Sequence, residues 1–392
     1  MQFIIPLLWI VFYIFLPDVK DILSINVNAA KELCQERILF AWDYTDYIKY
    51  EDWEWKELNV ILVFWESISP IDSKLLWWNN NMPNFDKIQM DGLYFTNFIS
   101  NWTDSIMSHQ SVLLWIPPIN KVWYYNYITE YLPQYLNNQW FITIFISTAS
   151  LKFLDERAHL NRIWFDKIIW EEAFENEKKY TRWAAPDEAL YNMALQEIKT
   201  QTGKYFMALP TISFHKEYDC PYGNTEKECL KYTDDKLYEF YTSLKNLWFF
   251  DSGILIIVWD HRKREPIEKW EYNLFWASWE NRGLSVVVWS WIDKNTINSN
   301  VITHTDLYYS LKKLLWKDKV KVDIYYNDIF ASNANRNWGI LEDSFIFKEG
   351  DQWVRYDIKT LKKKHNDIYL YYIALKNLQL IKNILTKQLI MW

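Results

Sequence analysis

The stretch NVILVFWESISP, residues 59–70, decides the predicted fold class. Its apolar run from Val60 to Phe64 is uninterrupted, which is typical of a strand that a parallel sheet buries on both faces. Glu66 and a short polar segment follow the run directly. Because the active groups of open α/β sheets gather at the carboxyl ends of their strands, we interpret Glu66 as a candidate site residue.

Five more strand-like runs follow, and helical patterns lie between several of them. The runs cover residues 94–99, 141–146, 205–213, 253–259 and 284–290, and the clearest helical patterns cover 187–201 and 233–248. Apolar strands that alternate with helices predict an α/β fold, with a mostly parallel central sheet and helices on both of its faces. A small α+β part is expected at the C-terminus.

We expect four parts along the chain. Residues 1–17 are apolar from Phe3 to Leu16, which indicates a membrane anchor or the end of a transmembrane helix. Residues 18–57 have the pattern of a helical connector, and residues 58–325 form the main α/β domain. Residues 326–392 contribute a hairpin and a terminal helix. The expected location is therefore a membrane-tethered one, with the main domain on the extracytoplasmic side.

Charge and cysteine content narrow the class of protein. The net charge of −7 and the pI near 5.5 argue against a nucleic-acid-binding role, which usually requires a basic face. The chain has three cysteines, Cys34, Cys220 and Cys229, and no pair of them has the spacing of a zinc ribbon. Cys220 and Cys229 enclose a short polar loop, so they either form a disulfide in an oxidising compartment or remain two free thiols.

The chain is very poor in glycine and very rich in tryptophan. It contains 7 glycines and 25 tryptophans among 392 residues, whereas a glycine content of about 7% is usual. Together the two counts are 32 of 392 residues, about 8%, which is an ordinary glycine content. Many tryptophans also stand at predicted turns, where a residue without Cβ is favoured. Some bacteria decode UGA as glycine, so we hypothesise that most of these tryptophans represent glycine. The alternative is a Trp-rich envelope protein that binds glycans on aromatic surfaces.

Reactive side chains occur at three predicted strand ends or turns. Glu66 follows the first strand, Thr103 lies in NWTDSIMS, and ILIIVWDH ends in Asp260 and His261. Two carboxylates, an imidazole and a hydroxyl are a plausible ligand set for a divalent cation, beside which the hydroxyl becomes a better nucleophile. Each element alone is a weak signal, since a threonine before Asp-Ser is often only a helix cap.

These segments together resemble the alkaline phosphatase superfamily, in its sulfatase-like branch and of the lipoteichoic acid synthase or phosphoglycerol transferase type. The resemblance runs from about residue 59 to 315 and rests on NVILVFWES, DGLYFTNFISNWTDSIMSHQSVLLWIPP, TISFHKEYDCP, GILIIVWDHR and ITHTDLYYSLKKLL. It makes residues 58–325 a sulfatase-like catalytic domain. The match improves where glycine is read for seven tryptophans, namely Trp65, Trp102, Trp115, Trp164, Trp170, Trp259 and Trp316.

The resemblance implies a role for each matching residue. Glu66, Asp260 and His261 take the places of metal ligands, and Thr103 that of the nucleophile, which also contacts the metal. His215, in TISFH, resembles the histidine that holds the substrate phosphate and assists proton transfer. Five further residues lie where relatives place groups near the pocket or bind the head group, and we list them as substrate-binding candidates: Arg157, His159, Arg162, His304 and Asp306.

The type of relative implies a reaction. TDSIMS lacks the proline and arginine that a sulfatase needs to make formylglycine, so a phosphotransferase is expected in preference to a sulfate ester hydrolase. The expected donor is a phospholipid head group, the acceptor a glycan or glycerol-type hydroxyl of the envelope, and the cofactor one Mn²⁺, with Mg²⁺ or Zn²⁺ as alternatives. A phosphoethanolamine transferase and a phosphodiesterase remain as alternative enzymes of the same chemistry.

Overall fold

The computed structural model describes residues 58–76, 79–114, 130–263, 282–315 and 327–332, together with the backbone of three strands between 338 and 357. The expected anchor at 1–17, the connector at 18–57 and the helix expected after 361 lie outside these residues. Among the described residues, no helix has both the length and the apolar character required to cross a membrane.

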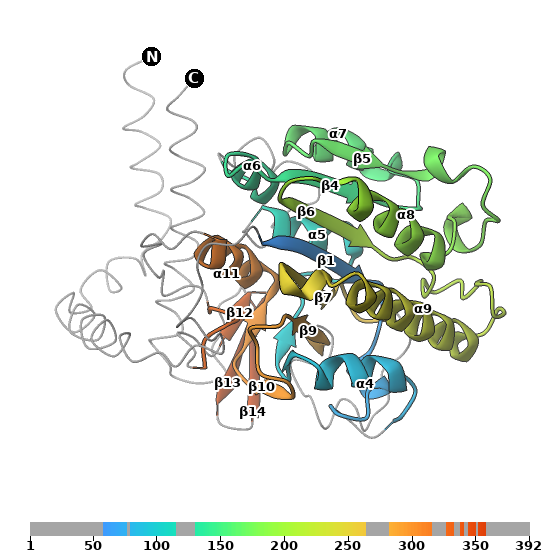
Figure 1. The fold of residues 1–392 in the computed structure, drawn as a ribbon. Coiled ribbons are helices and arrows are strands. Elements are labelled where there is room, and N and C mark those ends of the chain that lie inside the picture. The colour runs from blue at the N-terminus through green and yellow to red at the C-terminus, as the bar shows by residue number, and fades with distance from the viewer. Residues whose placement is uncertain are drawn as a thin grey trace, which may run out of the picture. The chain divides into compact units, whose positions relative to one another are not determined.

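An eight-stranded sheet forms the centre of the main domain, with the strand order β10-β2-β9-β7-β1-β6-β4-β5 (Figure 1). Its members are β1 (Asn59–Trp65), β2 (Leu93–Phe95), β4 (Ile142–Ile146), β5 (Lys167–Ile169), β6 (Tyr205–Pro210), β7 (Gly253–Trp259), β9 (Ser285–Val288) and β10 (Thr296–Asn298). Strand β1 is parallel to both of its neighbours, β6 and β7, and only β9 runs against the strands beside it. The predicted mostly parallel sheet is confirmed.

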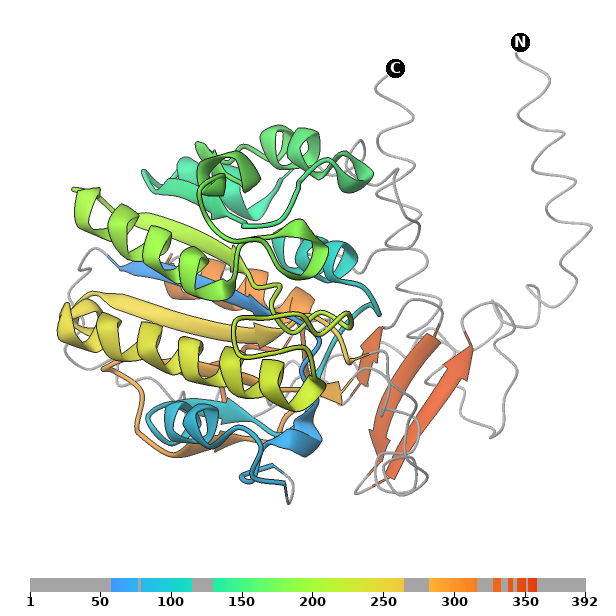
Figure 2. The same cartoon turned by 90° about the vertical axis from the view of Figure 1, so that its right-hand side faces the viewer.

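Helices cover both faces of this sheet, as predicted. They are α4 (Pro83–Met90), α5 (Ser105–Leu113), α6 (Leu132–Asn137), α7 (Glu156–Arg162), α8 (Asp187–Thr200), α9 (Glu226–Asn246) and α11 (His304–Leu315). Alternate residues of β1 enter two separate apolar clusters, one shared with α5, α6 and α11 and the other with α4, α8 and α9. Figure 2 shows α4, α8 and α9 side by side on one face. Because successive side chains of β1 point to opposite faces of the sheet, this strand contributes to the core on both faces.

Short elements complete the described structure. The 3-10 helices are η2 (Pro70–Asp72), η4 (Phe153–Asp155), η5 (Glu171–Phe174), η6 (Thr181–Trp183) and η7 (Phe249–Asp251). A small sheet joins β11 (Ile302–Thr303), β3 (Phe98–Ile99) and β8 (Arg282–Gly283), and another joins β12 (Trp338–Ile340), β13 (Ser344–Glu349) and β14 (Gln352–Asp357). The antiparallel pair of β13 and β14 is the expected C-terminal hairpin.

The two largest differences between predicted and observed bounds concern the strand expected at 94–99 and the helix expected at 233–248. The single strand expected at 94–99 is divided into β2 and β3, which belong to different sheets. Helix α9 begins at Glu226 and not at 233, because Thr225 and Glu228 form a capping box in which each side chain accepts a hydrogen bond from the other residue's backbone. The capping residues lie before the apolar periodicity starts, so the periodicity alone placed the helix start too late.

Four tryptophans have backbone conformations that favour glycine. Trp140, Trp164, Trp183 and Trp248 have φ values of 65°, 72°, 56° and 57°. Their side chains are also exposed, with relative accessibilities of 87%, 56%, 85% and 76%. A left-handed conformation is unfavourable for a residue with a Cβ atom, and an exposed indole gains little packing in return. These positions support the hypothesis that tryptophan stands for glycine there.

The two tryptophans that directly precede the candidate ligands, Trp65 and Trp259, are buried and not exposed. Trp65 and Trp259 are fully buried neighbours on β1 and β7, and both belong to the apolar cluster on the α8 and α9 side. The Trp65 Nε1 group donates a hydrogen bond to Thr233 Oγ1 at 3.1 Å. Neither indole is exposed, and the left-handed residue of the turn is Ser67, with φ of 56°. The turn after β1 therefore does not itself require glycine at position 65.

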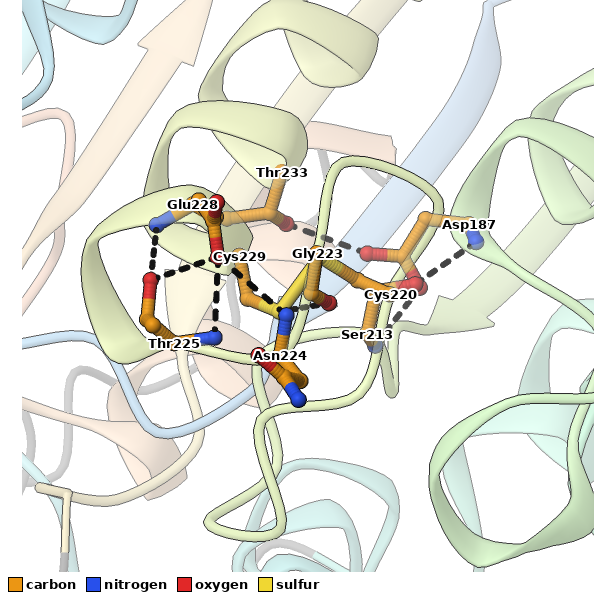
Figure 3. Close-up of a disulfide and its surroundings, with 9 residues drawn as sticks. All are labelled: Asp187, Ser213, Cys220, Gly223, Asn224, Thr225, Glu228, Cys229 and Thr233. Carbon is orange, nitrogen blue, oxygen red and sulfur yellow. Dashed lines mark hydrogen bonds between the residues drawn. A yellow bond between two sulfur atoms is a disulfide. The ribbon is translucent and has the colours of Figure 1, made fainter.

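A disulfide joins Cys220 to Cys229 (Figure 3). It links the loop after β6 to the first turn of α9, next to the capping residues Thr225 and Glu228. Of the two alternatives that the sequence left open, the structure contains the disulfide. The loop that carries His215 is therefore covalently attached to α9 at its far end.

Candidate functional site

The carboxyl ends of β1 and β7 bring three predicted ligands together. Glu66 follows β1, and Asp260 and His261 follow β7, its parallel neighbour. One ligand atom from each residue lies within 4.8 Å of the other two. All three side chains are almost fully buried. The parallel pairing of two strands thus places residues that are far apart in the sequence at one edge of the sheet.

The turn after β1 fixes the two carboxylates relative to each other. The left-handed conformation of Ser67 directs its backbone N–H to Asp260 Oδ1 at 2.9 Å, and its hydroxyl donates to Glu66 Oε1 at 2.5 Å. The Glu66 backbone N–H donates to Thr211 Oγ1 at 2.9 Å, which connects the turn to the segment after β6. These contacts hold the two carboxylates in place before any ion arrives.

His261 presents one ring nitrogen to the carboxylates. Its Nε2 atom lies 3.5 Å from Glu66 Oε1 and 3.6 Å from Asp260 Oδ2. The other nitrogen, Nδ1, lies 2.9 Å from the carbonyl oxygen of Arg262, which makes Nδ1 the donor of that hydrogen bond in the neutral ring. The lone pair of Nε2 is then directed into the site, which is the arrangement of a metal-binding histidine.

Ser105 supplies the hydroxyl at this site. It is the first residue of α5, and its Oγ lies 3.0 Å from Glu66 Oε2 and 3.1 Å from His261 Nε2. The preceding Asp104 caps the helix by accepting a hydrogen bond from the Met107 backbone N–H at 3.0 Å. Because Ser105 lies at a helix N-terminus, the helix dipole and free N–H groups favour negative charge beside its oxygen.

Thr103, the predicted nucleophile, lies two residues before α5 and is exposed. The contacts with Glu66 and His261 are made by Ser105 in its place. Ser105 was not among the predicted site residues. The Asp-Ser pair at the start of a helical pattern could have identified it, because a capping Asp104 places the next residue at the helix N-terminus. Ser100 holds this segment against β7 by donating to the Asp260 carbonyl oxygen at 2.6 Å.

The electrostatics of the site favour a bound cation. Burial raises the pKa of Glu66, and the neighbouring Asp260 raises it further, although His261 and His215 act in the opposite direction. Two buried carboxylates this close are unfavourable without a compensating positive charge. Two carboxylates, the Nε2 atom of His261 and the Ser105 hydroxyl therefore fit a divalent metal ion, with Mn²⁺, Mg²⁺ and Zn²⁺ all compatible with this mixed set.

His215 lies in the loop after β6, on the same edge of the sheet, and is half-buried. Its position lets its charge lower the pKa of Glu66. Asp187 anchors the start of this loop by accepting hydrogen bonds from the backbone N–H group of Ser213 at 3.1 Å (Figure 3) and from that of Ile212 at 2.9 Å. The loop is thus held by Asp187 at its start and by the disulfide at its end.

His304 and Asp306 lie inside the fold. His304 is fully buried, its Nε2 lies 2.6 Å from the Trp259 carbonyl oxygen, and burial lowers its pKa to about 3. Asp306, also fully buried, accepts hydrogen bonds from the backbone N–H groups of Thr303 at 2.6 Å and Asn327 at 2.9 Å. These contacts connect β11 and α11 to their surroundings, so the structure gives both residues a structural role and no open surface toward a substrate.

Arg157, His159 and Arg162 all lie on α7, which contacts α5 through Glu156, 3.6 Å from His109 Nδ1. The guanidinium of Arg157 lies over the Trp170 ring at 4.6 Å. Both arginines are exposed and His159 is partly exposed; its pKa is lowered by burial and by the charge of Arg162. The role of these three residues in head-group binding stays a prediction.

Comparison with known proteins agrees with this geometry. Residues 58–315 match the family model described as Sulfatase. No curated protein matches the chain. Among solved structures, a protein in the alkaline phosphatase superfamily from Vibrio parahaemolyticus is 20% identical, with a TM-score of 0.69 and coverage of 86% of this chain and 89% of that one.

Two further solved structures have the same fold. The lipoteichoic acid synthase LtaP from Listeria monocytogenes is 18% identical with a TM-score of 0.69, and 88% of this chain and 94% of that one are covered. The C-terminal periplasmic domain of EptC from Escherichia coli is 13% identical with a TM-score of 0.55, and 81% and 96% are covered. At these identities the likeness establishes the fold alone.

Proposed function

From the premise that this chain belongs to the sulfatase family, we propose that it is a divalent-metal-dependent phosphotransferase that uses Ser105 as its nucleophile. The observation that carries the proposal is the position of the Ser105 hydroxyl, 3.0 Å from Glu66 and 3.1 Å from His261, at the N-terminus of α5. A hydroxyl in this environment is readily deprotonated, and the helix N-terminus stabilises the oxyanion that results.

Glu66, Asp260 and His261 would hold the metal ion, with Ser105 beside it. When bound, the ion would favour the alkoxide form of Ser105 and neutralise charge on the phosphoryl oxygens of the substrate. The chain's own contribution is the fixed position of the nucleophile. The contact of Ser67 with both Glu66 and Asp260 keeps the carboxylates from separating under their mutual repulsion.

The proposed reaction has two steps, the formation and the breakdown of a covalent intermediate on Ser105. In the first, the Ser105 Oγ forms a bond to phosphorus while the bond from phosphorus to the lipid alcohol oxygen breaks, and the Ser105 proton leaves through Glu66 Oε2. His215 donates a proton from Nε2 to the departing alcohol. In the second step, an acceptor hydroxyl gives its proton back to His215 and bonds to phosphorus, and the Ser105 oxygen leaves and regains its proton.

The proposed donor is a glycerophospholipid whose phosphoglycerol head group is transferred to a glycan or glycerol-type hydroxyl of the cell envelope. Similarity to a lipoteichoic acid synthase supports this donor, and similarity to the periplasmic domain of EptC supports a phosphoethanolamine head group as the second candidate. Sulfate ester hydrolysis has less support, because Met107 and His109 stand where a formylglycine motif starting at Ser105 needs proline and arginine. The proposed location is extracytoplasmic and membrane-tethered; the disulfide supports the first part of this proposal, because such bonds persist in oxidising compartments.

The experiment that tests this proposal is mass spectrometry of the covalent intermediate. The protein is incubated with Mn²⁺ and phosphatidylglycerol or phosphatidylethanolamine, and the tryptic peptide of residues 88–121, which contains Thr103 and Ser105, is fragmented by electron transfer to place any adduct. Ser105→Ala and Thr103→Ala are the matched variants. We expect a glycerophosphate adduct on Ser105 that disappears only in Ser105→Ala.

Each other outcome has a distinct meaning. An adduct on Thr103 would keep the phosphotransferase and return the nucleophile to Thr103. A phosphoethanolamine adduct would keep Ser105 and change the donor. A protein that forms no adduct with either lipid, yet hydrolyses an aryl sulfate in a Ser105-dependent way, would overturn the proposed reaction in favour of a sulfatase.

A further inference from the structure

Glu217 connects the imidazole of His215 to a second loop. One carboxylate oxygen of Glu217, Oε2, contacts His215 Nδ1 and also accepts a hydrogen bond from Thr181 Oγ1 at 3.2 Å. The other oxygen, Oε1, lies 3.0 Å from Nε of Arg182. Each oxygen of the carboxylate is therefore engaged, and three residues from two separate segments converge on it.

The segment that supplies Thr181 and Arg182 is itself fixed. The Thr181 backbone N–H donates to the Asp219 carbonyl oxygen at 3.2 Å, so the two loops are also connected through their backbones. Arg182 has a φ of 54°, a left-handed conformation that costs energy in a residue other than glycine. Such a conformation persists only where the surroundings enforce it, and here it brings the guanidinium to Glu217.

A carboxylate at Nδ1 determines what the rest of the ring can do. The ring donates its Nδ1 proton to Glu217, which fixes the plane of the imidazole and leaves Nε2 for the substrate. The negative charge of Glu217 also stabilises the imidazolium that donates from Nε2 to a phosphate oxygen or a leaving alcohol. A carboxylate that orients a catalytic histidine in this way acts on the transition state more than on substrate binding.

We propose that Glu217 is a positioning residue for His215, held in place by Arg182 and Thr181, and that it keeps His215 Nε2 directed at the substrate phosphate. This inference rests on the proposed function, which gives His215 its role in catalysis. Burial on its own would raise the pKa of Glu217, but the hydrogen bond from His215 and the charge of Arg182 lower it overall, so the carboxylate stays ionised at neutral pH. Glu217 is exposed, and an ionised carboxylate is therefore compatible with its surroundings.

The test combines a structural measurement with kinetics on the full chain. Glu217→Ala removes the carboxylate, Glu217→Gln keeps its shape without the charge, and Glu217→Asp is the conservative rescue. Asp219→Asn is the matched control, because it removes one acidic charge from an exposed position in the same loop. Long-range ¹⁵N–¹H NMR, at a pH high enough for the imidazole to be neutral, reports which ring nitrogen of His215 carries the proton. This measurement does not require turnover.

We expect the Nδ1–H form of His215 in the parent protein and in Asp219→Asn, and a shift to the Nε2–H form in Glu217→Ala. For head-group release from phosphatidylglycerol with Mn²⁺, we expect kcat to fall about 10- to 100-fold in Glu217→Ala with KM nearly unchanged, by analogy with the loss seen when a metal-ligating histidine loses its carboxylate partner. The kcat of Glu217→Gln should lie between those of the parent protein and Glu217→Ala, and Glu217→Asp should retain most of the parent kcat.

Two results would overturn the inference: an unchanged His215 tautomer in Glu217→Ala, or an equal loss of kcat in Asp219→Asn. If no phospholipid is turned over by the parent protein, the proposed function fails, but the NMR measurement still decides whether Glu217 positions His215. Thermal unfolding of each variant separates a loss of folding from a loss of orientation, and Glu217→Gln, which keeps the side-chain size, remains informative if Glu217→Ala does not fold.

Discussion

Replacing the four left-handed tryptophans by glycine should stabilise the protein. The substitutions are Trp140→Gly, Trp164→Gly, Trp183→Gly and Trp248→Gly, at positions where φ lies between 56° and 72° and where more than half of each side chain is exposed. Most changes of a large residue to glycine destabilise, so a gain here would be a specific consequence of the backbone conformation.

The magnitude follows from two opposing terms. A left-handed conformation costs a residue with Cβ about 1–2 kcal/mol, and this cost disappears in glycine. Glycine has more conformational freedom to lose on folding, which costs about 0.5–1 kcal/mol. The net gain is about 0.5–1 kcal/mol at each position, and about 2–4 kcal/mol for all four if the sites are independent. Trp140 and Trp164 both bond Asn137, so this pair should also be measured together.

The assay is equilibrium unfolding in urea, followed by circular dichroism, with the parent protein expressed from tryptophan codons. The matched control is Trp170→Gly, because Trp170 has an extended backbone with φ of −147° and a buried side chain. This control should lose about 3–5 kcal/mol, the usual cost of removing a large buried aromatic side chain. If the four exposed substitutions destabilise as the control does, the left-handed backbone is not strained by tryptophan, and the argument for glycine at these positions fails.

Three further predictions concern the disulfide, a buried carboxyl and the metal site. Replacing Cys220 and Cys229 by serine should lower the free energy of unfolding by about 2–3 kcal/mol, the value for so short a closed loop, and a denaturant titration that shows no loss would contradict this. Burial raises the pKa of Asp234 to about 7, above its unfolded value of 3.8, so the folded protein holds a proton that the unfolded chain releases. The free energy of unfolding should therefore fall by up to about 4 kcal/mol between pH 4 and 7 and stay level above pH 7. Thermal unfolding of Asp234→Asn should not show this dependence on pH. Because the pKa of Glu66 is raised, Mn²⁺ binding should weaken and release more protons as the pH falls, which calorimetry in buffers of different ionisation enthalpy measures; Glu66→Gln should abolish both binding and release, and chelation should stop turnover.

The sheet and the proximity of the three candidate ligands could be predicted from the sequence for the same physical reason. Apolar runs such as Val60 to Phe64 identify buried strands without any knowledge of their neighbours. The residues that follow two such strands must then share an edge, provided that the strands are parallel and adjacent. Glu66, Asp260 and His261 met this condition, and the structure brings them together.

The remaining parts depend on information that is not local. Thr103 and Ser105 both carry a hydroxyl, and which of the two lies at the site depends on where α5 starts. Because α5 starts at Ser105, that hydroxyl lies at the site and the Thr103 side chain is exposed. The anchoring of Glu217 by Arg182 depends on the contact of two loops that neither periodicity nor composition describes. The fold buries the polar side chains of His304 and Asp306 against backbone partners, and those partners are distant in sequence and follow from no local pattern.

The central pairing of β1 with β6 and β7 has a consequence for how the protein reaches its native state. The hydrogen bond of the Ser67 backbone with Asp260 joins residues 193 positions apart, and the contact of Asn59 with Tyr205 spans 146. Folding rates fall as contacting residues become more distant in sequence, because loop-closure entropy is lost before the contacts repay it. The first strand must therefore remain unpaired until most of the domain has been synthesised, and its apolar length is exposed to aggregation during that interval. A chain released before residue 260 contains Glu66 but lacks Asp260 and His261, so the ion cannot assist the early steps of folding and can stabilise only the finished sheet.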